Sequence, residues 1–387
     1  MVSPPRGDTK VIPPDWHGEC RVPSERYHHL RRSTCKGANL KHIRLGSLFG
    51  LAASLCISAC SGSPPISNNG TAATVVYMLG DDPDGGLPDT VVGYQIGSAA
   101  STSPVSTLQL PSQYVGWLLT TGPSHELYVV VSNASGSGPQ VLVFAAGASG
   151  AAVPTRVIDL AYNPQSLFVD TNGKLYLASS GPAQNILVSV YGPDATGQAV
   201  PVRTLQSPTN EQPIDITVDP SGYIYLAGMP NSDSGNLPYS FIDVYPPDAE
   251  GYVEPIRSIS FAVFINGIAV DSSGYVFASV ESSLATGTSQ PTSVSVQQYS
   301  PAAHGYATPT RVVTLPQQAA GPTAGGLIGT GGGPVRFDGA GNIFTPGAKG
   351  SDGSFNYVLY KIAPGSTNPT AVVQSDPLSV SGGFTLN

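Results

Sequence analysis

The chain has 387 residues, including 45 glycines and 36 prolines, and only 11% of its residues are charged while 40% are hydrophobic. This composition excludes a disordered chain, because the apolar residues suffice for a core. It favours many short strands joined by tight turns over long helices. The length fits one large all-β domain as well as several smaller ones.

Charge differs sharply between the N-terminal region and the rest of the chain. Nine of the 17 basic residues but only four of the 25 acidic residues precede Cys60, so the remainder holds 8 basic and 21 acidic residues and a formal charge of −13. A body this acidic repels phosphate backbones, and we therefore expect no nucleic-acid partner.

The first element in chain order is an export signal over residues 40–60. Basic residues precede an apolar run, 45–59, that is too short to span a bilayer. The run ends in Ile57-Ser58-Ala59-Cys60, which resembles the bacterial lipobox. We expect an exported protein that is anchored to a membrane of the cell envelope through lipid on Cys60. Ser61 follows the cysteine, and by resemblance this implies outer-membrane sorting in a Gram-negative organism. The alternative is an ordinary secretory signal cleaved nearby.

The segments on either side of this signal have separate interpretations. Residues 1–39 do not suit a signal peptide, and we interpret them as a non-native or disordered extension, with translation starting near Leu40. The Ser-, Gly- and Asn-rich residues 61–72 indicate a flexible tether. Residues 73–387 form the body, which contains no cysteine and therefore no internal disulfide, zinc–thiolate site or cysteine nucleophile.

The body is built from a repeat that contains Asp-x-x-Gly. Each copy has two β-rich runs around a turn that suits Asp at its first position and Gly at a left-handed position, which predicts a β-hairpin and turn-forming rather than metal-binding aspartates. The four clear copies are residues 167–178, 216–227, 268–279 and 335–346, and a degenerate fifth covers 117–130.

A second repeated unit follows each hairpin and predicts a third and a fourth strand. It is clearest at 188–205 and 242–259, and looser copies begin at 141 and 296. Its arginines recur at one position of the unit, which indicates a role in outer-strand pairing or packing rather than an anion site; they are Arg156, Arg203, Arg257 and Arg311.

The strand count predicts the architecture. We read twenty-four strands from Val75 onward, which gives six blades of four antiparallel strands in a β-propeller. The first strand matches a second-strand position and the last a first-strand position. We therefore expect residues 383–387 to join the N-terminal blade and close the ring, which leaves no open edge between the chain ends.

The phrase Pro213-Ile-Asp-Ile-Thr-Val-Asp-Pro-Ser-Gly-Tyr-Ile-Tyr225 resembles the NHL repeat family, whose members are β-propellers, and residues 265–277 are equally similar. The resemblance covers roughly 73–387 and is more specific for fold than for activity. Related propellers of the gluconolactonase and regucalcin group imply a divalent cation at the centre of the ring. This chain departs from the family in the longer loops that follow its second strands.

The candidate site residues fall into two groups. Asp215 and Arg336 are unusual polar residues in first strands, with Glu211 beside the same inner strand as Asp215; a satisfied polar pair or channel lining fits them better than catalysis. The second group lies in the loops between second and third strands, which meet the inter-blade connections at one end of the blades; it comprises Asn231, Asp233, Glu281, Lys349 and Asp352. That face is the predicted binding surface.

Three functions remain open from the sequence. The first is a monomeric, non-enzymatic binding or scaffold protein without a cofactor, recognising a protein, peptide or glycan. The second is a lactonase-like hydrolase that uses a divalent cation such as calcium, which would take oxygen ligands here. The third is a structural component of the envelope. His125 and His304 are interpreted as loop residues outside any active site.

Overall fold

The computed structural model describes residues 74–81, 90–97, 99–133, 136, 138–182, 184–207, 211–230, 240–281, 293–316, 334–351, 354–375 and 379–387. The chain divides into two units, and all of these residues belong to the second, Asn68–Asn387. Cys60 and the predicted boundaries at residues 39, 60 and 72 lie outside the described residues. Within the described ranges no helix is long and apolar enough to cross a membrane.

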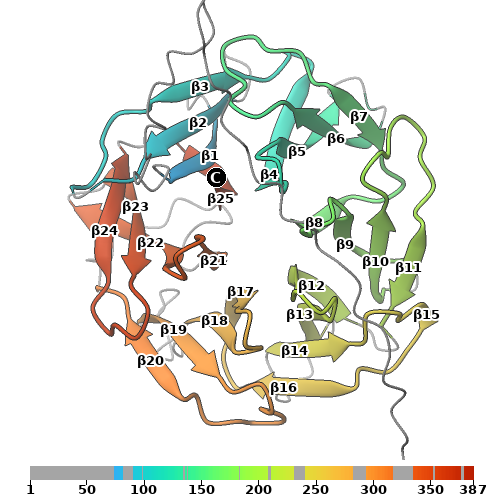
Figure 1. The fold of residues 1–387 in the computed structure, drawn as a ribbon, viewed down its shortest axis with the longest axis vertical. Coiled ribbons are helices and arrows are strands. Elements are labelled where there is room, and N and C mark those ends of the chain that lie inside the picture. Colours follow the sequence, from blue (N-terminus) through green and yellow to red (C-terminus); the bar gives the residue numbers. More distant parts are fainter. Residues whose placement is uncertain are drawn as a thin grey trace, which may run out of the picture. The chain divides into compact units, whose positions relative to one another are not determined.

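The described residues form a six-bladed β-propeller, as predicted (Figure 1). We number the blades 1 to 6 in chain order and give their strands from the centre outward. Blade 1 contains β25 (Ser379–Leu386), β1 (Val75–Asp81), β2 (Thr90–Gln95) and β3 (Ser106–Gln109). Blade 2 contains β4 (Tyr114–Thr121), β5 (Leu127–Asn133), β6 (Pro139–Phe144) and β7 (Arg156–Asp159). Blade 3 contains β8 (Pro164–Val169), β9 (Leu175–Ser180), β10 (Ile186–Tyr191) and β11 (Arg203–Gln206).

The other three blades repeat this order. Blade 4 contains β12 (Glu211–Val218), β13 (Ile224–Pro230), β14 (Ser240–Tyr245) and β16 (Arg257–Phe261). Blade 5 contains β17 (Ile265–Val270), β18 (Val276–Glu281), β19 (Val294–Tyr299) and β20 (Arg311–Thr314). Blade 6 contains β21 (Arg336–Phe337), β22 (Ile343–Ser351), β23 (Ser354–Ile362) and β24 (Thr370–Ser375).

One strand was not predicted. β15 (Gly251–Tyr252) lies in the loop that joins the third and fourth strands of blade 4, β14 and β16, which we call the outer hairpin loop of the blade. It pairs in parallel with β11 of blade 3. Two residues are too few to show the alternation of apolar and polar side chains that marks a strand in a sequence. Their pairing depends on the neighbouring blade, so the sequence did not predict this strand.

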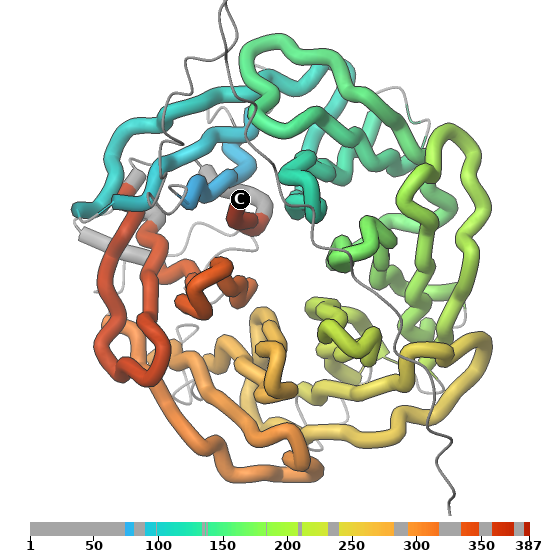
Figure 2. The backbone as a smooth tube through the Cα atoms, in the orientation of Figure 1, coloured from blue at the N-terminus to red at the C-terminus, as the bar shows by residue number. Residues whose placement is uncertain are grey.

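The C-terminal strand closes the ring, which confirms the prediction. β25 pairs antiparallel with β1, with Phe384 opposite Met78 and Leu386 opposite Val76. Figure 2 shows the C-terminal segment beside β1, the second strand of blade 1. Phe384 is fully buried, and the closing strand therefore contributes to the core as well as to the sheet.

The Asp-x-x-Gly segments form the tight turns between first and second strands. In blade 4, Oδ1 of Asp219 accepts hydrogen bonds from the backbone N–H groups of Ser221 and Tyr223, at 2.9 Å each, and Gly222 has φ 87°. Asp170, Asp271 and Asp338 accept equivalent bonds in their own blades. These aspartates form turns, as the sequence predicted.

The core lies between the blades. Second and third strands such as β5 and β10 are nearly continuously buried, because both faces of each blade are covered by neighbouring blades. The buried residues form six clusters, one between each pair of adjacent blades. The long apolar runs of these strands in the sequence are therefore explained by burial on both faces of each blade. Apolar contacts between neighbouring blades hold the ring together.

Three of the four repeated arginines, Arg156, Arg203 and Arg257, connect their blade to the next one, in agreement with the predicted packing role of this position. Arg257 donates from Nη1 to the carbonyl of Ala303 at 2.8 Å and lies over the ring of Tyr225. Arg156 donates to the carbonyls of Pro193 and Ala195, and Arg203 to that of Pro247. Each acceptor belongs to the outer hairpin loop, between third and fourth strands, of the following blade.

Candidate functional site

The innermost strands of four blades share a β-bulge, which changes the direction of one side chain in each strand. In blades 2 to 5 the pairing of first and second strands shifts by one residue at the same level, for example between Pro213 and Asp215 in blade 4. An extra residue of this kind bends the strand and turns the next side chain. The residues that follow the shift are Leu118, Ser166, Asp215 and Gly267, so Asp215 is the one acidic residue among these four.

Asp215 connects the inner strands of four blades. Its Oδ1 accepts from Ser166 Oγ of β8 at 2.7 Å, and its Oδ2 accepts from the backbone N–H of Ile268 of β17 at 3.0 Å. Nη1 of Arg336, from β21, lies 3.3 Å from the same Oδ2. The side chains of Asp215 and Arg336 are 5% and 17% exposed. The predicted pair therefore exists as a largely buried ion pair.

All the acceptor sites of the Asp215 carboxylate are occupied. Oδ1 also accepts from the backbone N–H of Ile216 at 2.9 Å, so each oxygen receives two donors. A carboxylate has about four lone-pair positions. Coordinating a metal or taking a proton from a substrate would require the loss of one of these protein bonds. The geometry therefore favours a structural role for Asp215.

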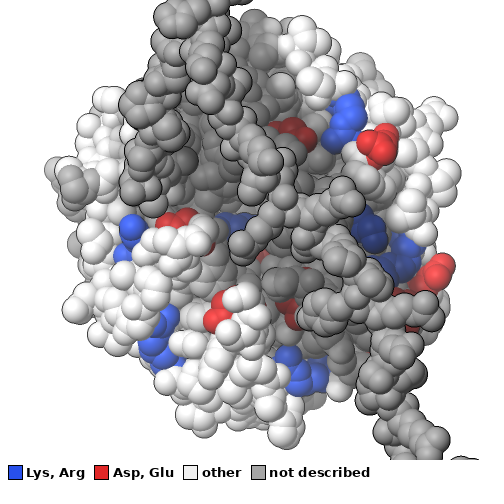
Figure 3. Space-filling model, viewed as in Figure 1, with Lys and Arg blue, Asp and Glu red and all other residues white. Residues whose placement is uncertain are grey.

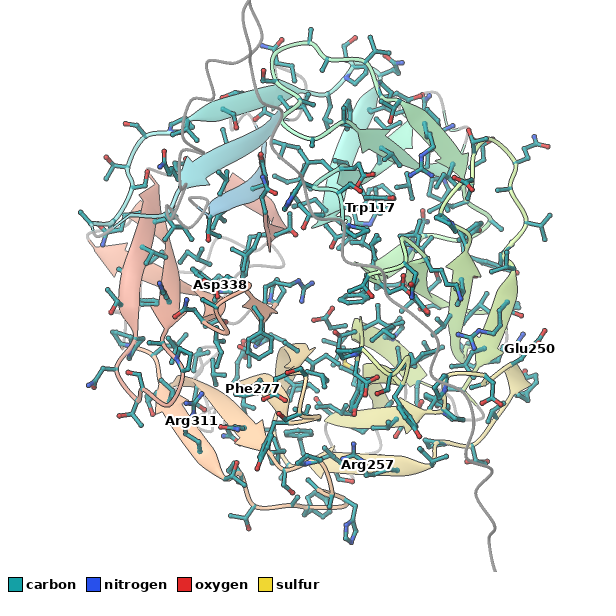
Figure 4. The ribbon with its side chains drawn as sticks, in the orientation of Figure 1. Trp117, Glu250, Arg257, Phe277, Arg311 and Asp338 are labelled. Carbon is teal, nitrogen blue, oxygen red and sulfur yellow. The ribbon has the colours of Figure 1, made fainter. Side chains whose placement is uncertain are left out.

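Arg336 and Ser166 complete this arrangement. Nη1 of Arg336 also donates to the carbonyl of Val335 at 2.8 Å, and Ser166 Oγ accepts from the backbone N–H of Ile216 at 3.1 Å. Elsewhere in the inner ring, the indole of Trp117 donates to the carbonyl of Pro164 at 3.1 Å, which links β4 to β8; Figure 4 labels Trp117 near the centre of the ring. Polar contacts between first strands thus supplement the apolar core.

Glu211 and Glu281 lie at the end of the blades where second strands lead into third strands. We call this end, with the inter-blade connections beside it, the loop rim. Glu211 Oε2 accepts from Ser207 Oγ at 3.1 Å, and Glu281 Oε1 accepts from Asn266 Nδ2 at 2.8 Å. Asp215 is four positions beyond Glu211 in the sequence, which corresponds to about 13 Å along a strand. The two glutamates are therefore rim residues, remote from the ion pair.

Asn231, Asp233 and Asp352 lie outside the described residues, and of Lys349 only the backbone, in β22, is described. In the part of the chain that the structure describes, no group of three or more His, Cys, Asp or Glu side chains could hold a metal ion.

One titratable residue escaped the sequence analysis. Asp243 in β14 is 6% exposed, and burial raises the pKa of its carboxyl to about 7 against the effect of a hydrogen bond from Ser258. Phe241 and Tyr245, on the same face of β14, pack against blade 3. A shifted pKa can indicate an active site. Here the carboxyl is enclosed between two blades, and we interpret it as a structural group. The sequence did not indicate its burial, because a single Asp in an apolar strand forms no motif.

One comparison with a solved structure bears on the fold, and none of the comparisons identifies a function. No protein-family model matches the chain, and neither does any curated protein. A solved structure of a protein of unknown function from Bacteroides caccae is similar at TM-score 0.52 and 10% identity, over 81% of this chain and 98% of that chain. A WD40 domain of Toxoplasma gondii coronin matches at TM-score 0.37 and 11% identity, over 66% and 69%. Identities this low carry no function from one protein to another.

Proposed function

We propose that this protein is an exported, lipid-anchored, NHL-like β-propeller that acts as a non-enzymatic binding or scaffold protein at the cell envelope, with the loop rim as its binding surface. The observation that carries the non-enzymatic part is the fully bonded carboxylate of Asp215, because the central acid that a lactonase would need for a cation already accepts four protein hydrogen bonds. Binding then falls to the rim, where loop length varies most and Glu211 and Glu281 are partly exposed.

The charge distribution supports a ligand other than nucleic acid. The body carries a formal charge of −13. On the face drawn in Figure 3, the Lys and Arg side chains of the described residues are scattered among neutral and acidic ones, without a continuous basic patch. A protein, peptide or glycan is the ligand class that fits such a surface.

Photo-crosslinking in the producing bacterium tests the binding surface. A photoreactive phenylalanine analogue placed at Phe264, which is 41% exposed on the loop rim, is expected to give a defined covalent adduct with the ligand. The matched control is the same analogue at Val153, which is 80% exposed in the hairpin loop of blade 2 at the opposite end of the blades. An adduct at Val153 and none at Phe264 would place binding elsewhere. Stoichiometric divalent metal together with turnover of a lactone panel would contradict the non-enzymatic proposal.

The anchor has its own test. Cys60→Ser is expected to move the protein from the membrane to the soluble fraction, because an acidic body has no affinity for anionic lipid to replace the acyl chains. Detergent partitioning measures the distribution, and mass spectrometry of the wild-type N-terminus detects the lipid. A variant that still sediments with membranes, with an unmodified wild-type Cys60, would refute the anchor. Cys56→Ser is the matched control and should leave the distribution unchanged.

A further inference from the structure

The outer edges of the blades are covered in a regular way. In blade 4, the backbone N–H of Gly305 donates to the carbonyl of Ser258, and the N–H of Ser260 donates to the carbonyl of Gly305, both at 2.8 Å. Gly305, which has φ 57°, belongs to the loop between β19 and β20 of blade 5, so a short parallel bridge from the next blade closes the edge of β16. We call this contact an edge clamp.

The edge clamp recurs at five of the six outer strands among the described residues. Besides β16, it covers β3, β7, β11 and β24. The bridged pairs are Leu108 with Gly150, Ile158 with Gly197, Leu205 with Gly251, Ile259 with Gly305, and Val373 with Ser101. Edge strands present unpaired backbone groups that attract other strands, and the clamps remove this hazard.

Blade 6 lacks the loop length that an edge clamp needs. In the five clamping blades, twelve residues separate the last ladder pair of the outer hairpin, such as Val244 and Arg257. In blade 6 only eight separate Lys361 from Thr370. The missing four residues correspond to the part of the loop that would reach the preceding blade. In the described ranges, no segment pairs with the outer edge of β20.

The open edge of β20 has the same geometry as the covered ones. Its inner side pairs with β19, with Val313 opposite Val296. By the alternation of an antiparallel ladder, the carbonyl of Val312 and the N–H of Thr314 point outward, as do the groups of Ser258 and Ser260 that bond to Gly305. Val312 is 46% exposed. The edge therefore offers one acceptor and one donor to a parallel strand.

Arg311 is the second feature that distinguishes this edge from the covered ones. Its equivalents in blades 2 to 4 donate to carbonyls of the clamping loop. Arg311 lies over the ring of Phe277, 5.8 Å from its centroid, and burial lowers the pKa of the guanidinium. Figure 4 labels both side chains in blade 5. Among the described residues no hydrogen-bond acceptor serves Arg311, so a partly desolvated cation stands beside the open edge.

We propose that the outer edge of β20 is a docking site for an extended acidic peptide segment of a partner protein, which adds to blade 5 as a parallel strand and supplies an acceptor for Arg311. Strand addition to an exposed edge is a common mode of peptide recognition. An acidic segment fits because a carboxylate satisfies a guanidinium more strongly than a neutral carbonyl does. This site is separate from the loop rim and does not depend on the function proposed for it.

A second copy of the chain fits the edge less well. Two β20 strands related by a two-fold axis would pair antiparallel, whereas the five covered edges all hold a parallel segment. β20 contains no acidic residue, so a second β20 would bring no carboxylate to Arg311.

A peptide copied from this chain's longest edge clamp provides the probe. Residues 246–254, Pro-Pro-Asp-Ala-Glu-Gly-Tyr-Val-Glu, contain β15 and two acidic residues ahead of it; Figure 4 labels Glu250 beside this strand. Binding of the fluorescein-labelled peptide to the full chain is measured by fluorescence anisotropy. We expect saturable binding, while a scrambled peptide of the same composition should bind at least about tenfold more weakly, since it keeps the charge and loses the strand register.

Three variants assign the binding to the edge. Thr314→Pro removes the outward N–H and leaves the ladder to β19 intact, and Arg311→Gln removes the cation; each is expected to weaken the peptide about tenfold or more. Replacing residues 363–369 by residues 246–256 restores the missing length, so blade 6 should clamp β20 in cis, abolish peptide binding and raise the thermal midpoint. Lys174→Gln, which removes the same charge from an exposed turn of blade 3, should leave the affinity unchanged.

Three results would overturn the proposal. The first is the absence of saturable binding, and the second is equal binding to the wild type and to the variant with the restored loop. The third is a concentration-dependent dimer in sedimentation that the restored loop abolishes, because the edge would then bind a second copy of the chain. If Thr314→Pro does not fold, the peptide affinities of Arg311→Gln and of the variant with the restored loop still test whether the peptide binds at the edge of β20.

Discussion

Deleting residues 383–387 is expected to cause the largest loss of stability of any short deletion in this protein. It removes the fully buried Phe384, whose loss alone costs about 3–5 kcal/mol, and the ladder bonds to β1 at about 1 kcal/mol each. It also removes Thr385, whose Oγ1 accepts from the backbone N–H of Thr121 at 3.0 Å and thereby joins blade 1 to blade 2. The sum approaches the whole stability of a typical domain, about 5–15 kcal/mol.

Calorimetry and limited proteolysis measure this effect. The truncated protein should melt at a much lower temperature, be cleaved near Val75, and self-associate through the edge of β1. Deleting five residues within 61–72 is the matched control, because the predicted tether contributes no core. If the two deletions melt alike, β25 does not hold the ring closed.

Asp215→Ala is expected to destabilise the propeller by about 3–5 kcal/mol, because the substitution leaves a largely buried guanidinium without its partner. It also leaves Ser166 Oγ and the backbone N–H of Ile268 without their acceptor. Arg336→Met should cost less, since three protein donors still serve the Asp215 carboxylate. Urea denaturation of both single variants and of the double variant gives the coupling energy.

Asp219→Ala is the control for this prediction. Asp219 lies at the tip of the same hairpin and accepts two backbone bonds, from the exposed Ser221 and the half-buried Tyr223, so its loss should cost about 2 kcal/mol, at about 1 kcal/mol for each bond. Equal destabilisation by the substitutions at Asp215 and Asp219 would show that Asp215 does not link the inner strands. If the wild-type protein binds a metal ion and Asp215→Ala abolishes this binding, the assignment of Asp215 as a structural group is wrong.

The sequence by itself determined the blades of this protein. Each Asp-x-x-Gly turn is specified within about five residues, because the aspartate bonds to backbone groups two and four positions ahead and glycine tolerates the left-handed position that follows. The apolar runs of second and third strands follow from burial between blades, and strand counting then gave six blades and the closing role of β25. These features are local or periodic, so one sequence contains them.

Tertiary structure decided what the central residues do. The donors that surround Asp215 come from positions 49, 53 and 121 residues away along the chain, and no spacing rule predicts that they meet. The bonded state of its carboxylate, which separates a structural acid from a metal ligand, depends on four blades being in place. The buried Asp243 was missed for the same reason, because its environment is created by the neighbouring blade.

The open edge of β20 combines both kinds of information. The shorter loop of blade 6, between Lys361 and Thr370, is visible in the sequence as a spacing. Only the structure shows that a loop of this type covers the preceding blade rather than its own, because the pairing of Gly305 with Ile259 joins residues of different repeats. With four residues fewer in blade 6, no such bridge to β20 of blade 5 forms among the described residues, since hydrogen bonding at a sheet edge is satisfied by whichever segment lies beside it in space.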